Sequence, residues 1–92
     1  MIVWKKSMLI VTSIYKLTSQ FPDDEKFGLT SQIKRSAVSI PSNIAEGYGR
    51  NYRKDYSRFL QISRGSLYEN QTQMEIAVNL SFLNVEDLKE IS

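Results

Sequence analysis

The fold of this chain is decided by residues 29–44, LTSQIKRSAVSIPSNI. The apolar side chains of this stretch follow one another at steps of four, four, three and four residues: Leu29, Ile33, Ala37, Ile40 and Ile44. Because successive residues of an α-helix turn by about 100°, all of them lie on one face. Pro41 falls inside the pattern, where it removes a backbone donor, and we expect it to kink the helix without ending it. The stretch therefore predicts a long amphipathic helix.

Proline and glycine residues mark the ends of this helix. Pro22 disfavours helical backbone at the residue before it, and the acidic run 23–25 suits the first turn of a new helix. At the other end, Gly47 and Gly49 supply a C-terminal stop. We therefore expect this helix to span about 24–47.

Amphipathic periodicity predicts further helices on both sides. Upstream, residues 3–20 repeat apolar side chains at spacings of three and four, which indicates a wide buried stripe. Downstream, residues 52–80 carry a near-heptad seam, formed by Tyr56, Phe59, Leu60, Ser63, Leu67, Asn70, Met74 and Ala77. Asn84 is a candidate N-cap with Asp87 at position N3, and it opens a short last helix over 84–92.

Composition excludes several classes of function. The chain is long enough for one domain, residues 1–92, and it contains neither cysteine nor histidine. Disulfides, thiolate metal sites and Ser-His-Asp catalysis are therefore excluded. Glu46 and Asp55 each lack a plausible second catalytic group. We expect a non-enzymatic all-α protein that uses no metal, cofactor or small-molecule substrate.

The N-terminal segment resembles a signal peptide only superficially. Lys5 and Lys6 precede the apolar run 8–11, which is short, is followed by Thr12 and Ser13, and lacks a small-residue cleavage pattern. No segment approaches the ~20 apolar residues that a membrane span needs. We expect a cytoplasmic protein without a membrane partner.

Positive charge is concentrated in the middle of the chain. The net charge is +2, but residues 34–64 carry +5, from seven basic and two acidic residues, and the remainder carries −3. The basic residues are Lys34, Arg35, Arg50, Arg53, Lys54, Arg58 and Arg64. The last four lie within about 140° of arc on the predicted helix 52–80, away from its apolar seam. Such a strip neutralises successive phosphates and predicts salt-dependent binding of RNA or DNA, in which Tyr48, Tyr52 or Tyr68 stacks on an unpaired base.

The same features have plainer interpretations. The basic strip is equally expected of a solvated helix face, in which case the protein is an interaction or scaffold module without a nucleic-acid role. A polar stripe on the second helix suits either a binding groove or, as we favour, hydrogen bonds between helices: Gln32, Arg35, Ser39, Ser42, Asn43 and Glu46. An apolar flank on the third helix, formed by Ile62, Ile76 and Leu80, is either the edge of the core or a subunit contact. Because a core of this size is small, we expect self-association.

Residues 27–50, FGLTSQIKRSAVSIPSNIAEGYGR, closely resemble the signature of a known family. Its members are four-helix-bundle proteins encoded in intervening sequences of bacterial large-subunit (23S) ribosomal RNA genes. The resemblance covers nearly the whole chain and also includes Val3-Trp4, 15–18, Phe59-Leu60, 65–67, Glu69, Thr72-Gln73 and 75–77.

The resemblance implies an up-and-down bundle of four helices that assembles into a ring-like homopentamer and has no known catalytic activity. Association of the family with ribosomal RNA is inferred from the location of its genes, and a similar fold serves as the nucleic-acid-binding accessory protein of diversity-generating retroelements. The polar signature residues match in place: Arg35, Asn43, Glu46 and Arg50.

This sequence departs from the family pattern in two respects. Asn70 and Gln71 stand where the family usually has an apolar residue and an acid, which predicts different local packing. Family members also usually continue through a complete fourth helix, whereas here it is short. We expect either that the fragment is truncated or that the open seam is filled by another copy of the chain.

Overall fold

The apolar face of the second expected helix is buried, as its spacing predicts. In the computed structural model, which describes residues 1–91, Ile33 and Ala37 have no solvent exposure. The helix that carries them, α2, spans Leu29–Tyr48 and continues without interruption through the buried Pro41. Its apolar face is therefore the centre around which the other helices pack.

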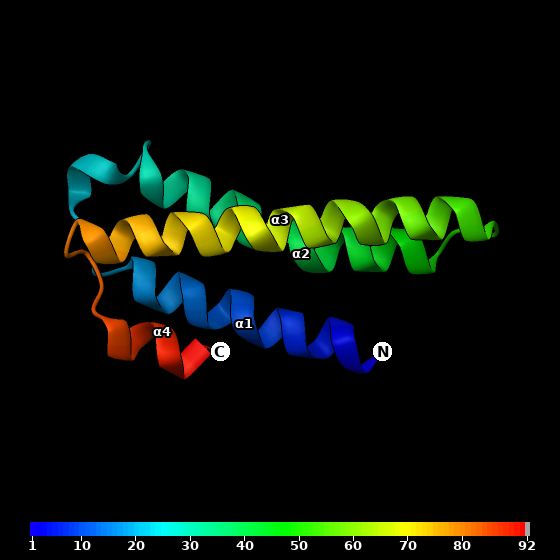
Figure 1. Ribbon diagram of the computed structural model, residues 1–92, viewed down its shortest axis with the longest axis horizontal. Coiled ribbons are helices and arrows are strands. Elements are labelled where there is room, and N and C mark those ends of the chain that lie inside the picture. Colours follow the sequence, from blue (N-terminus) through cyan, green and yellow to red (C-terminus); the bar gives the residue numbers. More distant parts are fainter. Residues whose placement is uncertain (92) are drawn as a thin grey trace.

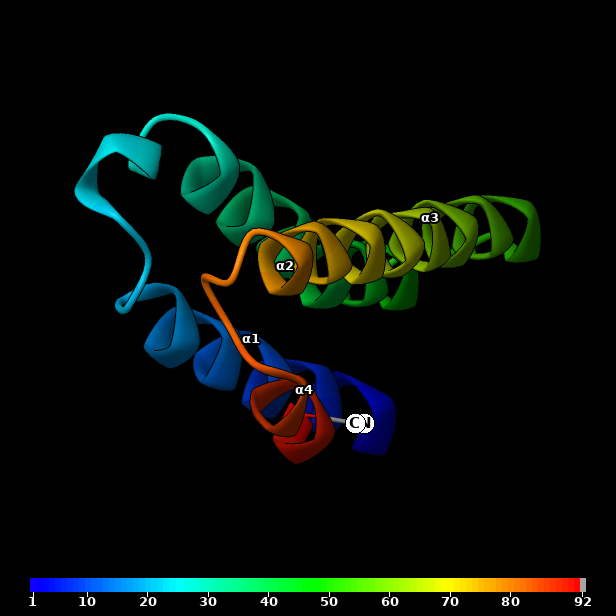
Figure 2. The same cartoon turned by 60° about the vertical axis from the view of Figure 1, so that its left-hand side comes forward.

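Four α-helices follow one another in alternating directions (Figure 1). Within the described residues the elements are α1 Ile2–Thr18, the 3-10 helix η1 Asp23–Glu25, α2 Leu29–Tyr48, α3 Arg53–Asn79 and α4 Val85–Ile91. The long helices α2 and α3 form the principal pair, α1 packs on α2, and α4 lies against α1 (Figure 2). This arrangement confirms the expected all-α bundle. Each helix is either too short or too polar to cross a membrane, as far as the described residues go.

The second helix begins later than its sequence pattern predicted. Residues Asp23–Glu25 form η1 and not the first turn of α2, and the chain turns at Gly28, whose ψ of −116° lies outside the helical range. The Oε1 atom of Glu25 then accepts a hydrogen bond from the backbone N–H of Leu29 at 3.0 Å. The carboxylate thus satisfies a free donor at the start of α2, a local contact that periodicity does not reveal.

Polar side chains are buried between α2 and α3. The hydroxyl of Ser36 donates a hydrogen bond to Oε1 of Gln73 at 2.7 Å. The amide of Asn70 donates to Ser36 Oγ at 3.0 Å and to the backbone carbonyl of Ile33 at 3.1 Å. Asn70, where the sequence departs from the family pattern, therefore has its amide nitrogen paired inside the interface, which keeps its burial from being costly.

A second set of short side chains continues this interface toward the other end of the pair. Ser63 donates to the backbone carbonyl of Ile40 at 2.8 Å, and the hydroxyls of Ser39 and Ser66 lie 2.7 Å apart. The predicted seam of α3 included Ser63 but not the buried Ser66, whereas its Tyr56 is 38% exposed. The predicted seam is therefore partly wrong, since it omits Ser66 and includes Tyr56. Small hydroxyl side chains and not bulky apolar ones make this part of the contact between α2 and α3.

Gly47 is a packing residue and not the helix stop that was predicted. It lies buried inside α2, and a Cβ at this position would meet the Cβ of Phe59 at 2.9 Å and Cδ1 of Tyr56 at 3.3 Å. The missing side chain lets α3 approach α2 closely. The helix ends at Tyr48, and Gly49 is its C-cap, as predicted for that glycine.

The apolar core lies where α1, α2 and α3 meet. Its buried members are Ile14, Phe21, Ile33, Ala37, Met74, Ala77 and Leu83. The first half of α1 contributes less than expected, because α1 diverges from α3 toward its N-terminus (Figure 1). Val3 is 57% exposed and Met8 is 41% exposed. The wide buried stripe predicted for residues 3–20 is therefore wrong for this half of the helix.

Helix α3 ends in a Schellman-type turn. Ser81 adopts a positive φ of 63°, and the N–H of Phe82 donates to the carbonyl of Ala77 at 2.9 Å. The N–H of Ser81 donates to the carbonyl of Val78 at 2.9 Å. Carbonyl groups at the end of α3 are thus paired, and the chain reverses toward α4.

The capping residues predicted for α4 are confirmed. The Oδ1 atom of Asn84 accepts a hydrogen bond from the N–H of Asp87 at 2.9 Å, and Oδ2 of Asp87 accepts one from the N–H of Asn84 at 3.1 Å. This reciprocal pair is a capping box. The last residue of the expected helix, Ser92, lies outside the described residues.

Candidate nucleic-acid interface

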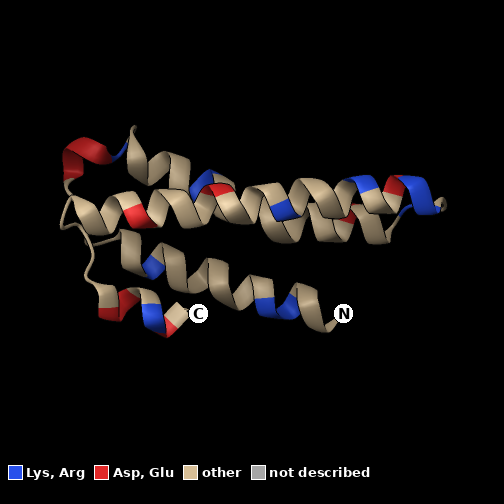
Figure 3. Ribbon diagram, viewed as in Figure 1, with Lys and Arg blue, Asp and Glu red and all other residues tan. Residues whose placement is uncertain are grey.

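Opposite charges gather at the two ends of the molecule (Figure 3). Basic residues are concentrated where α2 ends and α3 begins, whereas η1 and the first turn of α4 carry acidic residues at the other end. We call the following exposed residues the basic face: Arg50, Arg53, Lys54, Arg58 and Arg64. The tight connection between α2 and α3 brings these side chains onto one end and flank of the helix pair.

Two arginines of the basic face are positioned by one aromatic ring. The guanidinium carbon of Arg50 lies 4.8 Å from the ring centroid of Phe59, and that of Arg58 lies 5.0 Å from it. A guanidinium at this distance from an aromatic ring is held by a cation–π contact. Arg50 also pairs with Glu46, at 3.1 Å between Nη2 and Oε2. Phe59 was predicted only as a seam residue, so its role as a platform was missed.

The next two cations, Arg53 and Lys54, pair with no carboxylate of residues 1–91. In the part of the chain that the structure describes, the ion pairs are Arg50–Glu46 and Lys89–Glu86. The charges of Arg53 and Lys54 are therefore available to a ligand. Both are exposed in the first turn of α3.

Arg64 extends the basic face along α3. Its Nε atom donates a hydrogen bond to the hydroxyl of Tyr68 at 3.4 Å, which raises the pKa of the Arg64 guanidinium above its ordinary value. The ring of Tyr68 lies 5.6 Å from the same guanidinium. Arg64 follows Arg53 by about 16 Å along the helix axis, so the face is long enough to span several phosphates.

Lys34 and Arg35, predicted as part of the same site, lie apart from it. They precede the end of α2 by roughly 20 Å of helix. Lys34 is half-buried with its Nζ 4.9 Å from the ring centroid of Tyr15 on α1, and Arg35 donates to Ser31 Oγ at 3.3 Å. Lys34 and Arg35 are therefore near the basic face in sequence but not in space.

A small cavity adjoins the basic face. It measures about 280 Å³ and is lined by Gly47, Tyr48, Arg50, Asn51, Tyr52, Arg53 and Tyr56. We call it the tyrosine pocket, because three of its members are tyrosines spaced four residues apart. Tyr48 and Tyr52 are 65% and 73% exposed. Tyr56 had been assigned to the seam, and the four-residue spacing was the signal that could have placed it here.

The polar signature residues serve local contacts. The amide of Asn43 donates to the backbone carbonyl of Ser39 at 2.8 Å and to its hydroxyl at 2.9 Å, and Glu46 is paired with Arg50. Ser39 in turn contacts Ser66 on α3. The polar stripe thus includes one contact between helices, and Asn43 orients the serine that makes it.

The apolar flank of α3 is accessible on this single chain. Ile62, Ile76 and Leu80 are 44%, 42% and 53% exposed. At 100° per residue they fall within about 40° of one another on α3. They are therefore not interior core residues, and they form one stripe.

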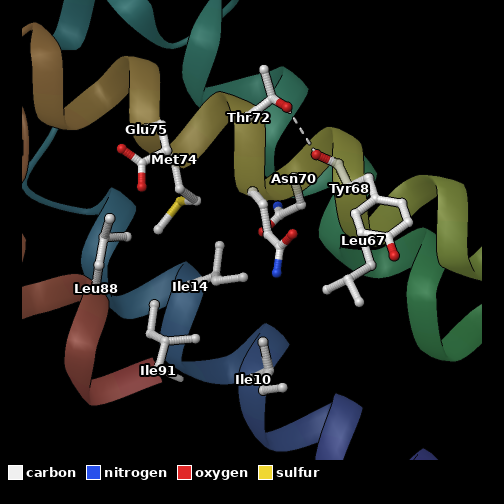
Figure 4. A pocket seen from close by; sticks show the side chains of 11 residues that line it. Ile10, Ile14, Leu67, Tyr68, Asn70, Thr72, Met74, Glu75, Leu88 and Ile91 are labelled. Atoms are coloured by element: carbon white, nitrogen blue, oxygen red, sulfur yellow. Dashed lines mark hydrogen bonds between the residues drawn. The ribbon is translucent and has the colours of Figure 1, made fainter.

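A larger groove lies between α1, α3 and α4 (Figure 4). It measures about 560 Å³, and its apolar lining comprises Ile10, Ile14, Leu67, Met74, Leu88 and Ile91. The amide nitrogen of Asn70 is already bonded to Ile33 and Ser36, and Thr72 donates to the carbonyl of Tyr68 at 3.0 Å. The groove therefore resembles an extension of the core more than a site with converging polar groups.

The described residues contain no cluster of three His, Cys, Asp or Glu side chains that could hold a metal ion.

Comparison with a curated protein sequence gives a partial match. An insulin-degrading enzyme homolog of Dictyostelium discoideum is 32% identical over 74 residues, which is 74% of this chain but 8% of that protein. The chain thus spans a small fraction of that relative.

The other comparisons cover the chain almost completely. A solved structure from Bacteroides thetaiotaomicron, described as a protein with unknown function from the S23 ribosomal protein family, matches with a TM-score of 0.85 and 26% identity. That match covers 97% of this chain and 83% of the other. The family model described as 23S rRNA-intervening sequence protein matches residues 1–92. This chain belongs to the 23S rRNA-intervening sequence protein family.

Proposed function

We propose that this protein is a non-enzymatic homo-oligomer that binds structured nucleic acid through its basic face. The observation that carries the proposal is the pair Arg53 and Lys54, exposed and without carboxylate partners among the described residues, beside two arginines that Phe59 holds in place. Cations fixed along a rigid helix neutralise neighbouring phosphates and release their counterions. Ribosomal RNA, named in the description of the family, is the first ligand to test.

We include self-association in the proposal because it raises the affinity for nucleic acid. Five cations on one chain make few phosphate contacts, so a single chain would bind weakly. A closed ring of copies, such as the pentamer that the family resemblance implies, multiplies the contacts that one RNA molecule makes at once. The exposed flank of Ile62, Ile76 and Leu80 is the surface through which we propose that copies associate.

Charge reversal tests the proposal against a matched control. The variant Arg53→Glu/Lys54→Glu reverses two adjacent charges on the basic face, and Lys5→Glu/Lys6→Glu does the same at two adjacent exposed lysines of α1. Titration of a structured fragment of 23S ribosomal RNA should show roughly a tenfold or larger loss of affinity for the first variant. The α1 variant should bind nearly as well as the unmodified protein. Equal losses in both variants would mean that net charge, and not the basic face, governs binding.

A second candidate is a protein-interaction module. It is favoured by the apolar side chains left exposed on the first half of α1, among them Ile2 at 75% and Leu9 at 69%. Affinity purification of the tagged protein with and without nuclease separates the two candidates. A protein partner that persists after nuclease treatment supports the module, and loss of all partners on nuclease treatment supports nucleic-acid binding.

A further inference from the structure

We propose that the tyrosine pocket takes up a single unpaired nucleobase, so that the protein selects nucleic acid with a bulged or looped-out nucleotide over continuous duplex. This inference rests on the proposed nucleic-acid function and adds the kind of structure that is recognised. It starts from one juxtaposition: Tyr48, Tyr52 and Tyr56 line the same cavity as Arg50 and Arg53.

The aromatic rings that line the tyrosine pocket are accessible to a ligand. Tyr48 and Tyr52 are 65% and 73% exposed, and no hydrogen bond within the described residues involves the hydroxyl of either one or of Tyr56. Exposed aromatic rings beside a basic groove are the usual stacking platforms of proteins that bind single-stranded nucleic acid. Packing within the fold leaves the rings of Tyr48 and Tyr52 mostly exposed, whereas a stacked base would cover them.

Close packing of the helices holds the third ring. The ring atom Cδ1 of Tyr56 lies 3.3 Å from where a Cβ of Gly47 would be, so any larger residue would push the ring outward. Tyr56 is correspondingly the least exposed of the three, at 38%. Tyr56 is therefore the tyrosine of the pocket that helix packing fixes most closely.

The size and charge of the pocket favour one base with its phosphate. At about 280 Å³ the cavity is slightly smaller than the roughly 300–1,000 Å³ typical of small-ligand sites. Arg53 in its lining, which pairs with no carboxylate of the described residues, supplies a cation for the phosphate attached to that base. A base inside a continuous duplex is stacked and paired, so it reaches such a pocket only after it is flipped out, whereas a bulged base presents its face without that cost.

The test uses two RNA hairpins that differ by one uridine: when it is present it pairs with a single 2-aminopurine, and when it is omitted that 2-aminopurine is bulged. We expect the unmodified protein to bind the bulged hairpin roughly 5- to 150-fold more tightly, the range that stacking of one base contributes. We also expect the fluorescence of the bulged 2-aminopurine to fall on binding, because stacking quenches it.

Three variants assign the preference to the pocket. Tyr52→Leu should remove the preference and the fluorescence change while binding of the paired hairpin stays the same. Tyr52→Phe keeps the ring and should keep both. Tyr15→Leu, at an exposed tyrosine of α1 outside the pocket, should behave like the unmodified protein. Thermal melting by circular dichroism verifies that each variant folds, which is expected because Tyr52 is mostly exposed.

The binding results distinguish failure of the pocket assignment from failure of the proposed function. Equal, salt-dependent binding of both hairpins would overturn the pocket assignment and leave the basic face as the binding surface. Loss of the preference in Tyr15→Leu but not in Tyr52→Leu would also overturn it. If neither hairpin binds in a salt-dependent manner, the proposed function fails and this inference fails with it.

Discussion

Gly47 and Phe59 mark the closest approach of α2 to α3, because a Cβ on Gly47 would lie only 2.9 Å from the Cβ of Phe59. The ring of Phe59 in turn carries the guanidinium groups of Arg50 and Arg58. Close packing of the two helices and the placement of two basic side chains therefore depend on the same contact.

Replacement of Gly47 by alanine should destabilise the protein. Alanine favours helix over glycine by about 1 kcal/mol, but the added methyl group would be forced against Phe59 Cβ and the backbone oxygen of Tyr56, at 3.3 Å. Overpacking of this kind costs about 1–3 kcal/mol, so we expect a net loss of up to ~2 kcal/mol in the free energy of unfolding. Urea unfolding followed by circular dichroism measures it.

Gly65→Ala is the matched control. Gly65 lies inside α3, and a Cβ there would meet no atom within 4 Å. Without a clash the helix propensity acts alone, and the variant should gain about 0.5–1 kcal/mol. Equal changes at both glycines would contradict the assignment of Gly47 as a packing residue.

Asn70→Ala should cost about 1–3 kcal/mol in the free energy of unfolding. The substitution leaves the carbonyl of Ile33 and the hydroxyl of Ser36 with one hydrogen bond fewer in a buried interface. Its exposed neighbour Gln71 donates and accepts no hydrogen bond within the described residues, so Gln71→Ala should change stability by less than about 0.5 kcal/mol. A neutral Asn70→Ala would show that the buried amide does not stabilise the helix pair.

Much of the fold could be predicted because apolar spacing is a local signal. Ile33 and Ala37 are buried as their four-residue step requires, and Asn84 with Asp87 forms the expected capping box. Periodicity does not show what a helix packs against. It therefore missed Ser66 as an interface residue, since a lone serine has the same local pattern whether it faces water or Ser39.

The candidate site could be predicted less completely. The exposed strip from Arg53 to Arg64 follows from helical geometry, but Lys34 is close to it only in sequence and lies against Tyr15 instead. Tyr48 and Tyr52 were predicted as stacking residues, but the pocket that they line together with Tyr56 was missed, because it depends on how the α2–α3 connection folds back. Tertiary contacts of this kind are not contained in the pattern of one helix.

Ser81→Gly should stabilise the protein by about 0.5–1 kcal/mol. Ser81 adopts a φ of 63°, a left-handed conformation that costs an ordinary residue about 1–2 kcal/mol and glycine little. Part of that gain is offset by the greater entropy of glycine in the unfolded chain. Ser57→Gly, in the interior of α3, is the control and should destabilise instead. Thermal unfolding of the two variants should show shifts of opposite sign.

The double variant Ile76→Glu/Leu80→Glu should lower the molecular mass in solution. Both side chains belong to the exposed apolar flank, and a carboxylate in an apolar contact between copies is strongly unfavourable. Val85→Glu/Leu9→Glu, at exposed positions outside the flank, should leave the mass unchanged. Analytical ultracentrifugation measures all three proteins, and an unchanged mass for the flank variant would place the subunit contact elsewhere.

The salt dependence of RNA binding tests the central claim most directly. Each phosphate neutralised contributes about 0.7–0.9 to the slope of log K against log salt concentration. Arg53→Gln/Lys54→Gln should therefore reduce the magnitude of that slope by about 1.4–1.8 for every subunit that contacts the RNA, while Lys5→Gln/Lys6→Gln should leave it unchanged. A slope that stays the same in the Arg53→Gln/Lys54→Gln protein would contradict binding through the basic face.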